Sequence, residues 1–206
     1  MPKRAVVLAG LVVAGLLAGH ELFGHGGPAP AVDPGPVESP PVPAAAFQAQ
    51  VLRVVDGDTL LARMPGRRDP VQVRVIGVDT PETVKPDTPV ACFGPQASAF
   101  SKHLLPPGTI VRAAHEHGGD TDRYGRELWD VWLPDGRFLE SVLAAAGAAR
   151  AYPYPPQVEH AELIGRLAAE ARSRRRGLWG DPCDGNSFGN NGSRQPLDLP
   201  GVSGRP

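Results

Sequence analysis

Short apolar runs, separated by polar turn residues, recur through the middle of the chain. Asp56-Gly57 and Pro65-Gly66 are two of the turns, and the runs around them are rich in Val, Ile and Leu. Runs of this length, bounded by Gly, Pro and Asp, are typical of β-strands. The pattern predicts five strands, at residues 50–55, 59–64, 71–78, 109–113 and 128–133.

Three other segments have the residue spacing of an amphipathic helix. The first, residues 96–105, ends before Pro106-Pro107, and the second covers residues 138–148. The third covers residues 158–176 and is followed by Gly177, a residue type that commonly follows a helix C-terminus. Five strands with three helices predict one small α+β domain.

The N-terminal residues have the pattern of an export signal. Lys3-Arg4 is followed by an uncharged apolar run from Ala5 to Gly19. A basic start and a short apolar run are the first two regions of a signal peptide. Residues 5–23 are therefore expected to act either as a cleaved signal or as a membrane tether. The protein is expected to be secreted or anchored on the outer face of the cytoplasmic membrane.

Composition separates the ends of the chain from its middle. Residues 24–46 are rich in Pro, Gly and Ala, which favours an extended spacer with no core of its own. From Gly185 onward the chain is rich in Gly, Asn, Ser and Pro, which is typical of a disordered tail. The expected organisation is a signal or anchor at 1–23, a linker at 24–46, the domain at 47–184 and a tail at 185–206.

Net charge and cysteine content bear on the class of protein and on its cellular compartment. The 21 basic and 22 acidic side chains give a formal net charge of −1, unlike the strongly basic proteins that coat nucleic acid. An enzyme that must release a polymer can still focus positive charge in one cleft. In an exported protein the two cysteines, Cys92 and Cys183, are expected to form one disulfide, with two free thiols as the alternative.

Acidic and arginine side chains lie near the ends of the predicted strands. Asp58 follows the first turn, Arg74 lies within the third run, and Asp79-Thr80-Pro81-Glu82 follows that run. Carboxylate and carbonyl oxygens bind hard cations such as Ca²⁺, and arginines pair with phosphate oxygens. Taken singly, Asp56-Gly57 is a hairpin turn and Arg74 a solvent-facing strand residue. The chemical interpretation requires these groups to meet.

Six motifs resemble the staphylococcal nuclease family in sequence and in order. They are Val55-Asp-Gly-Asp-Thr59, Arg74-Val-Ile-Gly-Val-Asp-Thr-Pro-Glu82, Gly94-Pro-Gln-Ala-Ser-Ala-Phe100, Asp122-Arg-Tyr-Gly-Arg126, Ala151-Tyr-Pro-Tyr154 and Gly177-Leu-Trp179. The resemblance covers residues 47–184. It implies a five-stranded OB-fold barrel with three helices. It also implies calcium-dependent hydrolysis of DNA and RNA that leaves 3′-phosphates.

The resemblance also implies roles for individual residues. The catalytic residues would be Arg74 and Arg126, which stabilise charge on the phosphate, and Glu82, the general base. The Ca²⁺ ligands would be the carboxylates of Asp58 and Asp79 and the backbone carbonyl of Thr80. The terminal phosphate and a base would be held by Arg123, Tyr124, Tyr152 and Tyr154. Arg123 stands where the family commonly has Lys, so the charge is kept.

Two other classes of protein remain as alternatives. One is a non-catalytic OB-fold module that binds nucleic acid or a protein partner at the cell surface. The other is a calcium-binding structural module, which has no need of the two arginines or the tyrosines. His115-Glu-His117 is expected to be an ordinary loop sequence, because no cysteine or histidine cluster suited to zinc accompanies it. The protein is expected to be a monomer.

Overall fold

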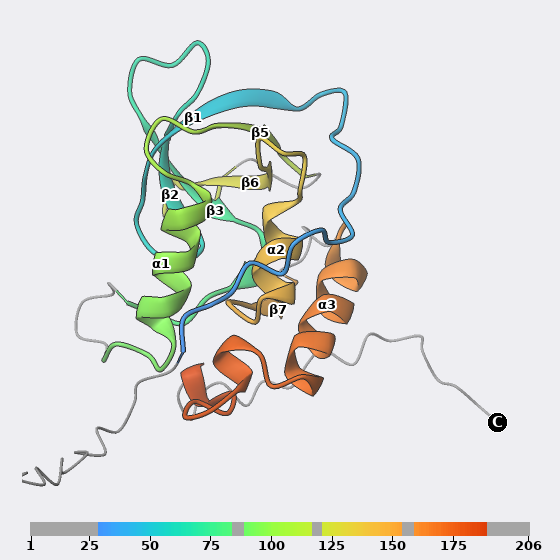
Figure 1. Cartoon of the computed structure of the whole chain (residues 1–206). Helices are drawn as coiled ribbons and strands as arrows, with labels where there is room; N and C mark the ends of the chain where they lie inside the picture. Colours follow the sequence, from blue (N-terminus) through green and yellow to red (C-terminus); the bar gives the residue numbers. More distant parts are fainter. Residues whose placement is uncertain (1–28, 84–88, 117–120, 154–158, 189–206) are drawn as a thin grey trace, which may run out of the picture.

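The computed structural model describes residues 29–83, 89–116, 121–153 and 159–188. Its centre is a closed five-stranded barrel with the strand order β1-β2-β3-β6-β5 (Figure 1). The barrel strands are β1 (Phe47–Val54), β2 (Thr59–Arg63), β3 (Val71–Val75), β5 (Ile110–Ala114) and β6 (Glu127–Trp132). β3 and β6 pair in parallel, and the other neighbours pair antiparallel. The predicted α+β class and five-stranded barrel are confirmed.

The predicted strand at residues 71–78 is divided into two. β3 ends at Val75, and β4 (Gly77–Asp79) leaves the barrel to pair antiparallel with β7 (Arg150–Tyr152). Gly77 has a φ of +76°, a conformation that glycine adopts readily, and this allows the chain to change direction. β7 was not predicted, because three residues are too few to show a period.

The three predicted helices are present in the described residues; the first begins two residues earlier than predicted, and the other two are shorter than predicted. They are α1 (Gly94–Leu104), α2 (Leu139–Ala145) and α3 (Ala161–Ser173). α3 buries one stripe that includes Ile164 and Ala171. The short 3₁₀ turns η1 (Gly177–Trp179) and η2 (Asn186–Phe188) follow it. Within the described ranges no helix is both long and apolar enough to cross a bilayer, and the proposed tether at 5–23 lies outside those ranges.

The proline-rich stretch before the barrel packs against the domain. Residues 29–46 contain no helix or strand, and Ala31 and Val37 contact the core. Trp132 Nε1 donates to the carbonyl of Pro40 at 2.9 Å. The backbone N–H of Phe138 donates to Ser39 Oγ at 3.0 Å. The contacts come from barrel and helix residues distant in sequence, so composition alone does not indicate them.

A disulfide and buried side chains hold the C-terminal end of the described chain against the domain. Cys92 and Cys183 form a disulfide with a Cα–Cα distance of 5.6 Å, so the predicted bridge is confirmed over the alternative of free thiols. Phe188 packs against the core, and Ser187 is buried. The packed region therefore extends past the expected boundary at Asp184.

Candidate active site

The turn between β1 and β2 presents a buried carboxylate. Asp58 is 6% exposed, and its Oδ2 accepts hydrogen bonds from Thr80 N at 2.8 Å and Thr80 Oγ1 at 3.0 Å. A Cβ at Gly57 would lie 2.6 Å from the Thr80 side chain, so glycine permits this approach. Ser101 Oγ on α1 donates to the carbonyl of Gly57 at 2.6 Å. The Asp-Gly sequence is thus both a turn and part of the site.

Arg74 bridges the two predicted carboxylate ligands. Its NH1 lies 3.4 Å from Asp58 Oδ2, and its NH2 lies 3.4 Å from Asp79 Oδ1. The guanidinium also donates to the carbonyl of Val78 at 2.8 Å and to that of Val75. The Arg74 side chain is only 14% exposed. It therefore turns toward the acidic residues and is not an ordinary solvent-facing strand residue.

Arg150 is a member of the site that the sequence did not reveal. It lies on β7 opposite Asp79, and its Nε and NH2 approach Asp79 Oδ2 at 2.9 and 2.7 Å. The arginine also lies 5.5 Å from the ring centroid of Tyr152. The only sequence signal was a charge just before the Ala151-Tyr-Pro-Tyr154 motif. Its pairing depends on the short β4–β7 sheet, which was not predicted.

Negative charge accumulates at this turn despite the arginines. Burial and the neighbouring Asp58 carboxylate raise the pKa of Asp79, against the lowering effect of Arg74 and Arg150. Burial and the same carboxylate raise the pKa of Asp56 to about 6. Repulsion between buried like charges is relieved when a cation binds. Carboxylate oxygens from Asp58 and Asp79 beside Thr80 fit a hard divalent cation such as Ca²⁺.

Glu82 lies beyond the rigid Thr80-Pro81 step. Its Oε1 accepts a hydrogen bond from Thr83 N at 2.9 Å, and its charge contributes to the raised pKa of Asp56 after burial and Asp58. The start of α1 approaches closely, since a Cβ on Gly94 would lie 2.8 Å from the carbonyl oxygen of Glu82. The structure therefore holds the glutamate near the acidic turn through backbone packing.

Arg126 belongs to a second group, held by Asp122. Asp122 Oδ2 accepts from Arg126 Nε at 2.7 Å, and Oδ1 accepts from the backbone N–H groups of Tyr124 and Arg126 at 2.9 and 3.0 Å. Burial raises the pKa of Asp122, but these bonds outweigh it and hold the pKa below its usual value. Arg126 therefore pairs with Asp122.

The parallel pairing of β3 with β6 fixes the position of Arg74 relative to that of Arg126. It places Leu128 opposite Arg74, and Arg126 is the residue before β6 begins. Both predicted arginines thus project from adjacent parts of the barrel.

Of the tyrosines predicted to hold a base of the substrate, Tyr124 and Tyr152 lie among the described residues. Tyr124 is 68% exposed, with the guanidinium groups of Arg123 and Arg126 at 4.7 and 5.6 Å from its ring centroid. Tyr152 on β7 is 41% exposed, so both rings present surface on which a base can stack. Tyr154 lies outside the described residues.

Comparisons with known proteins show which family the sequence belongs to. A family model described as staphylococcal nuclease homologue matches residues 72–181. Thermonuclease from Staphylococcus hyicus is 42% identical over 130 residues, which cover 63% of this chain and 74% of that protein. Thermonuclease from Staphylococcus intermedius is 44% identical with the same coverage. Endonuclease YncB from Bacillus subtilis is 35% identical over 128 residues, covering 62% of this chain and 59% of that protein.

Proposed function

Since this chain belongs to the staphylococcal nuclease family and is a hydrolase of phosphodiester bonds, we propose that it requires Ca²⁺, acts on DNA and RNA, and leaves 3′-phosphates. The observation that carries the proposal is the arrangement of buried Asp58 and half-buried Asp79 around Arg74. Non-catalytic binding modules have no need of this arrangement. The related proteins are also named as nucleases.

The ion would be held by oxygen ligands of this turn. Asp58 and Asp79 supply carboxylates, and the backbone carbonyl of Thr80 supplies a neutral oxygen. The raised pKa values of Asp56 and Asp79 support this assignment, because a cation would offset the repulsion that raises them. When bound, the ion supplies Lewis-acid stabilisation of charge on a phosphoryl oxygen.

The protein side chains would have separate roles in catalysis. Arg74 and Arg126 would bind equatorial phosphate oxygens and stabilise the negative charge that increases in the transition state. Glu82 would accept a proton from the attacking water or orient that water. Departure of the 5′-oxygen leaves the phosphate on the 3′ side. The terminal phosphate and a base would contact Arg123, Tyr124, Tyr152 and Tyr154.

We also propose that the enzyme works outside the cytoplasm. The basic start and apolar run of residues 3–19 support export, and the Cys92–Cys183 disulfide supports an oxidising compartment. Weak extracellular calcium sites fill at about 10⁻⁴–10⁻³ M, which suits such a location. Mass spectrometry of the N-terminus in medium and membrane fractions tests the proposal. A full-length chain found only in the cytosol would contradict it.

A nuclease assay on the purified full chain tests the mechanism. Hydrolysis of single-stranded DNA and of RNA should occur with Ca²⁺, stop with chelator and resume when Ca²⁺ is restored. Mg²⁺ should support little turnover because it demands tighter octahedral geometry. Fragments should carry 5′-hydroxyl ends, which accept phosphate from a polynucleotide kinase without prior dephosphorylation. Complete DNA hydrolysis in chelator would overturn the calcium requirement.

An Asp58→Asn variant provides the matched test of the ligand set. Asparagine keeps the size of the side chain but removes the charge that a hard cation needs. The variant should lose activity at all practical Ca²⁺ concentrations, whereas Asp135→Asn, at an exposed turn, should keep it. Equal activity of the two variants would remove Asp58 from the ion site.

A further inference from the structure

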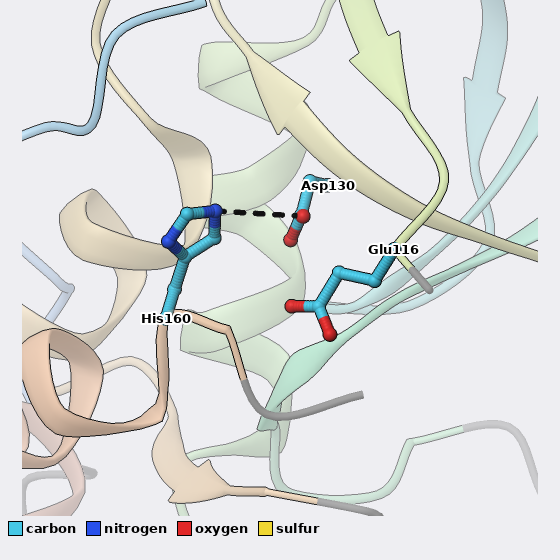
Figure 2. A group of neighbouring side chains, drawn as sticks. All are labelled: Glu116, Asp130 and His160. Atoms are coloured by element: carbon cyan, nitrogen blue, oxygen red, sulfur yellow. Dashed lines mark ion pairs between the residues drawn. The ribbon is translucent and has the colours of Figure 1, made fainter. Parts of the chain in front are cut away.

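Three side chains from separate elements converge on one point outside the nuclease site. Glu116 follows β5, Asp130 lies within β6, and His160 precedes α3. Figure 2 shows the imidazole and the two carboxylates facing one another. One potential ligand atom from each residue lies within 4.8 Å of the others. Asp130 is 3% exposed and Glu116 9%, so the cluster is sheltered from bulk water.

The spacing within the cluster is longer than a hydrogen bond. His160 Nε2 lies 3.6 Å from Asp130 Oδ2, beyond the range of a normal hydrogen bond. Ligands of a tetrahedral zinc ion, each about 2.1 Å from the metal, are separated by about 3.4 Å. The Glu116 carboxylate accepts a hydrogen bond from Glu159 N at 3.4 Å. The atoms are therefore placed as ligands of a common ion would be.

A fully buried carboxyl on α2, that of Glu140, lies near this cluster. Its Oε1 accepts a hydrogen bond from Val131 N at 3.1 Å. Among the described residues its Oε2 has no hydrogen-bond partner. Burial, and then the charges of Asp130 and Glu116, raise the pKa of Glu140 well above its usual value. The unpartnered carboxylate oxygen thus belongs to a group that lies within electrostatic reach of the cluster.

The charge balance of the cluster also favours a cation. Burial, and then the negative charges of Glu116 and Glu159, raise the pKa of Asp130 to about 8. Burial lowers the pKa of His160, against the opposing effect of Glu159, which favours the neutral imidazole that binds metals. Several buried carboxylates beside a neutral histidine are costly unless protons or a metal ion offset their charge.

We propose that Glu116, Asp130 and His160 form a second metal site, which takes zinc. Imidazole together with carboxylates suits zinc, whereas Ca²⁺ takes six to eight oxygen ligands. The buried carboxyl of Glu140, within electrostatic reach of these residues, would help to balance the charge of the ion. The site shares no residue with the proposed calcium ligands and does not depend on the proposed nuclease mechanism. Zinc there would join the barrel strands β5 and β6 to the start of α3.

The sequence did not indicate this site. Its residues are far apart in the chain and form none of the short His/Cys spacings typical of zinc sites. Glu116 lies between His115 and His117, but His115 is engaged elsewhere: its Nε2 lies 3.0 Å from Glu127 Oε2 and 3.1 Å from Trp129 Nε1.

Zinc titration of the full chain by calorimetry, with metal analysis after dialysis, tests the proposal. One tightly bound zinc per chain should depend on the cluster. Asp130→Asn and His160→Asn should each weaken it by about 100-fold or more, because loss of even an outer-shell partner costs 10–100-fold. The controls His103→Asn, on α1, and Asp58→Asn, at the nuclease site, should bind zinc as the wild type does. Zinc binding that is absent, or equal in all four variants, would overturn the site.

A second experiment needs no cluster variant and so does not depend on variant folding. The wild-type chain is loaded with Cu²⁺ and treated with ascorbate and peroxide, which oxidises histidines that bind the metal. Peptide mapping should find oxidation at His160, suppressed by equimolar zinc, and little at His103. Oxidation confined to other histidines would mean that protons alone balance the cluster, and would overturn the proposal.

Discussion

Two groups of buried carboxylates in this domain balance their charge in different ways. Around Asp79, guanidinium groups of Arg74 and Arg150 approach at 3.4 and 2.7 Å. Around Asp130 the basic neighbour is His160, at 3.6 Å. The pKa of Asp130 is raised mainly by burial and further by the charges of Glu116 and Glu159. The first group has permanent positive charges beside it, and the second has a titratable one.

This difference determines what each group can do. Arginine is charged at all working pH values, so carboxylates beside it favour the ionised form that a hard cation or a phosphate-binding site requires. Carboxylates beside a neutral imidazole must take up protons or a metal ion. Burial raises the pKa of both Asp79 and Asp130, so burial of acidic residues does not identify a function by itself. The neighbouring charges then add to that shift or oppose it.

The largest expected effect comes from changing the arginines of the first group. Arg74→Lys and Arg126→Lys keep the charge but lose the two-pronged guanidinium geometry. Each should lower turnover by about 10²–10³-fold, the size seen for removal of one preorganised charge-stabilising donor. Steady-state rates with DNA and Ca²⁺ measure this.

The control for these variants is Arg53→Lys, an exposed arginine on β1. It should keep the wild-type rate, and circular dichroism should show all three variants folded. Wild-type turnover in Arg74→Lys or Arg126→Lys would remove that arginine from the catalytic group.

A smaller effect is expected at Arg150, which acts on Asp79. Arg150 lowers the pKa of Asp79, against burial and Asp58, so Arg150→Gln should raise it further. Asp79 must be ionised to hold a cation, and the acidic limb of the pH–rate profile should therefore move to higher pH. A shift of about one unit, typical of a nearby charge, should lower the rate by about 10-fold at pH values on that limb, below the pKa.

The control for Arg150 is the profile of Arg112→Gln, on β5. Its acidic limb should stay at the wild-type position. A fall in rate at Arg150→Gln without any shift of the limb would mean that Arg150 contacts substrate and does not act through Asp79.

The second group should make stability depend on pH in the metal-free protein. The folded-state pKa of Asp130 is raised from 3.8 to about 8, so the folded chain binds a proton that the unfolded chain releases. Its stabilisation is complete below pH 3.8 and is lost as pH rises toward 8. Between these values Asp130 alone contributes a decline of up to about 1.4 kcal/mol per pH unit.

Urea unfolding in chelator at several pH values measures that slope. Asp130→Asn should flatten it, whereas Glu162→Gln, an exposed residue of α3, should not. An unchanged slope in Asp130→Asn would mean that its carboxyl titrates normally in the folded state.

The sequence predicted the barrel and the first group better than the second. Asp58 and Asp79 follow strands whose periods are visible, and short turns constrain where their side chains lie. The motifs added the family pattern, which located Arg74 and Arg126. Arg150 was missed because its position depends on β7, a three-residue strand formed only by tertiary pairing.

The second group could not be predicted for a different physical reason. Glu116, Asp130 and His160 come from three elements, and nothing in their local sequence distinguishes them from surface residues. Only closure of the barrel and packing of α3 bury them together. The strap formed by residues 29–46 was likewise expected as a spacer, because its anchors, such as Trp132 and Phe138, lie far along the chain.

The smallest expected effect is the coupling between the two groups. They share no residue, and effects at sites without shared partners add to within about 0.5 kcal/mol. The turnover of Arg74→Lys/Asp130→Asn in Ca²⁺ should therefore equal the value obtained by multiplying the two single effects. Initial rates of the four proteins, at saturating DNA and at a temperature where all remain folded, complete the cycle. A coupling well above 0.5 kcal/mol would show that the charge state around Asp130 reaches the nuclease site, and the two groups would then have to be treated as one electrostatic unit.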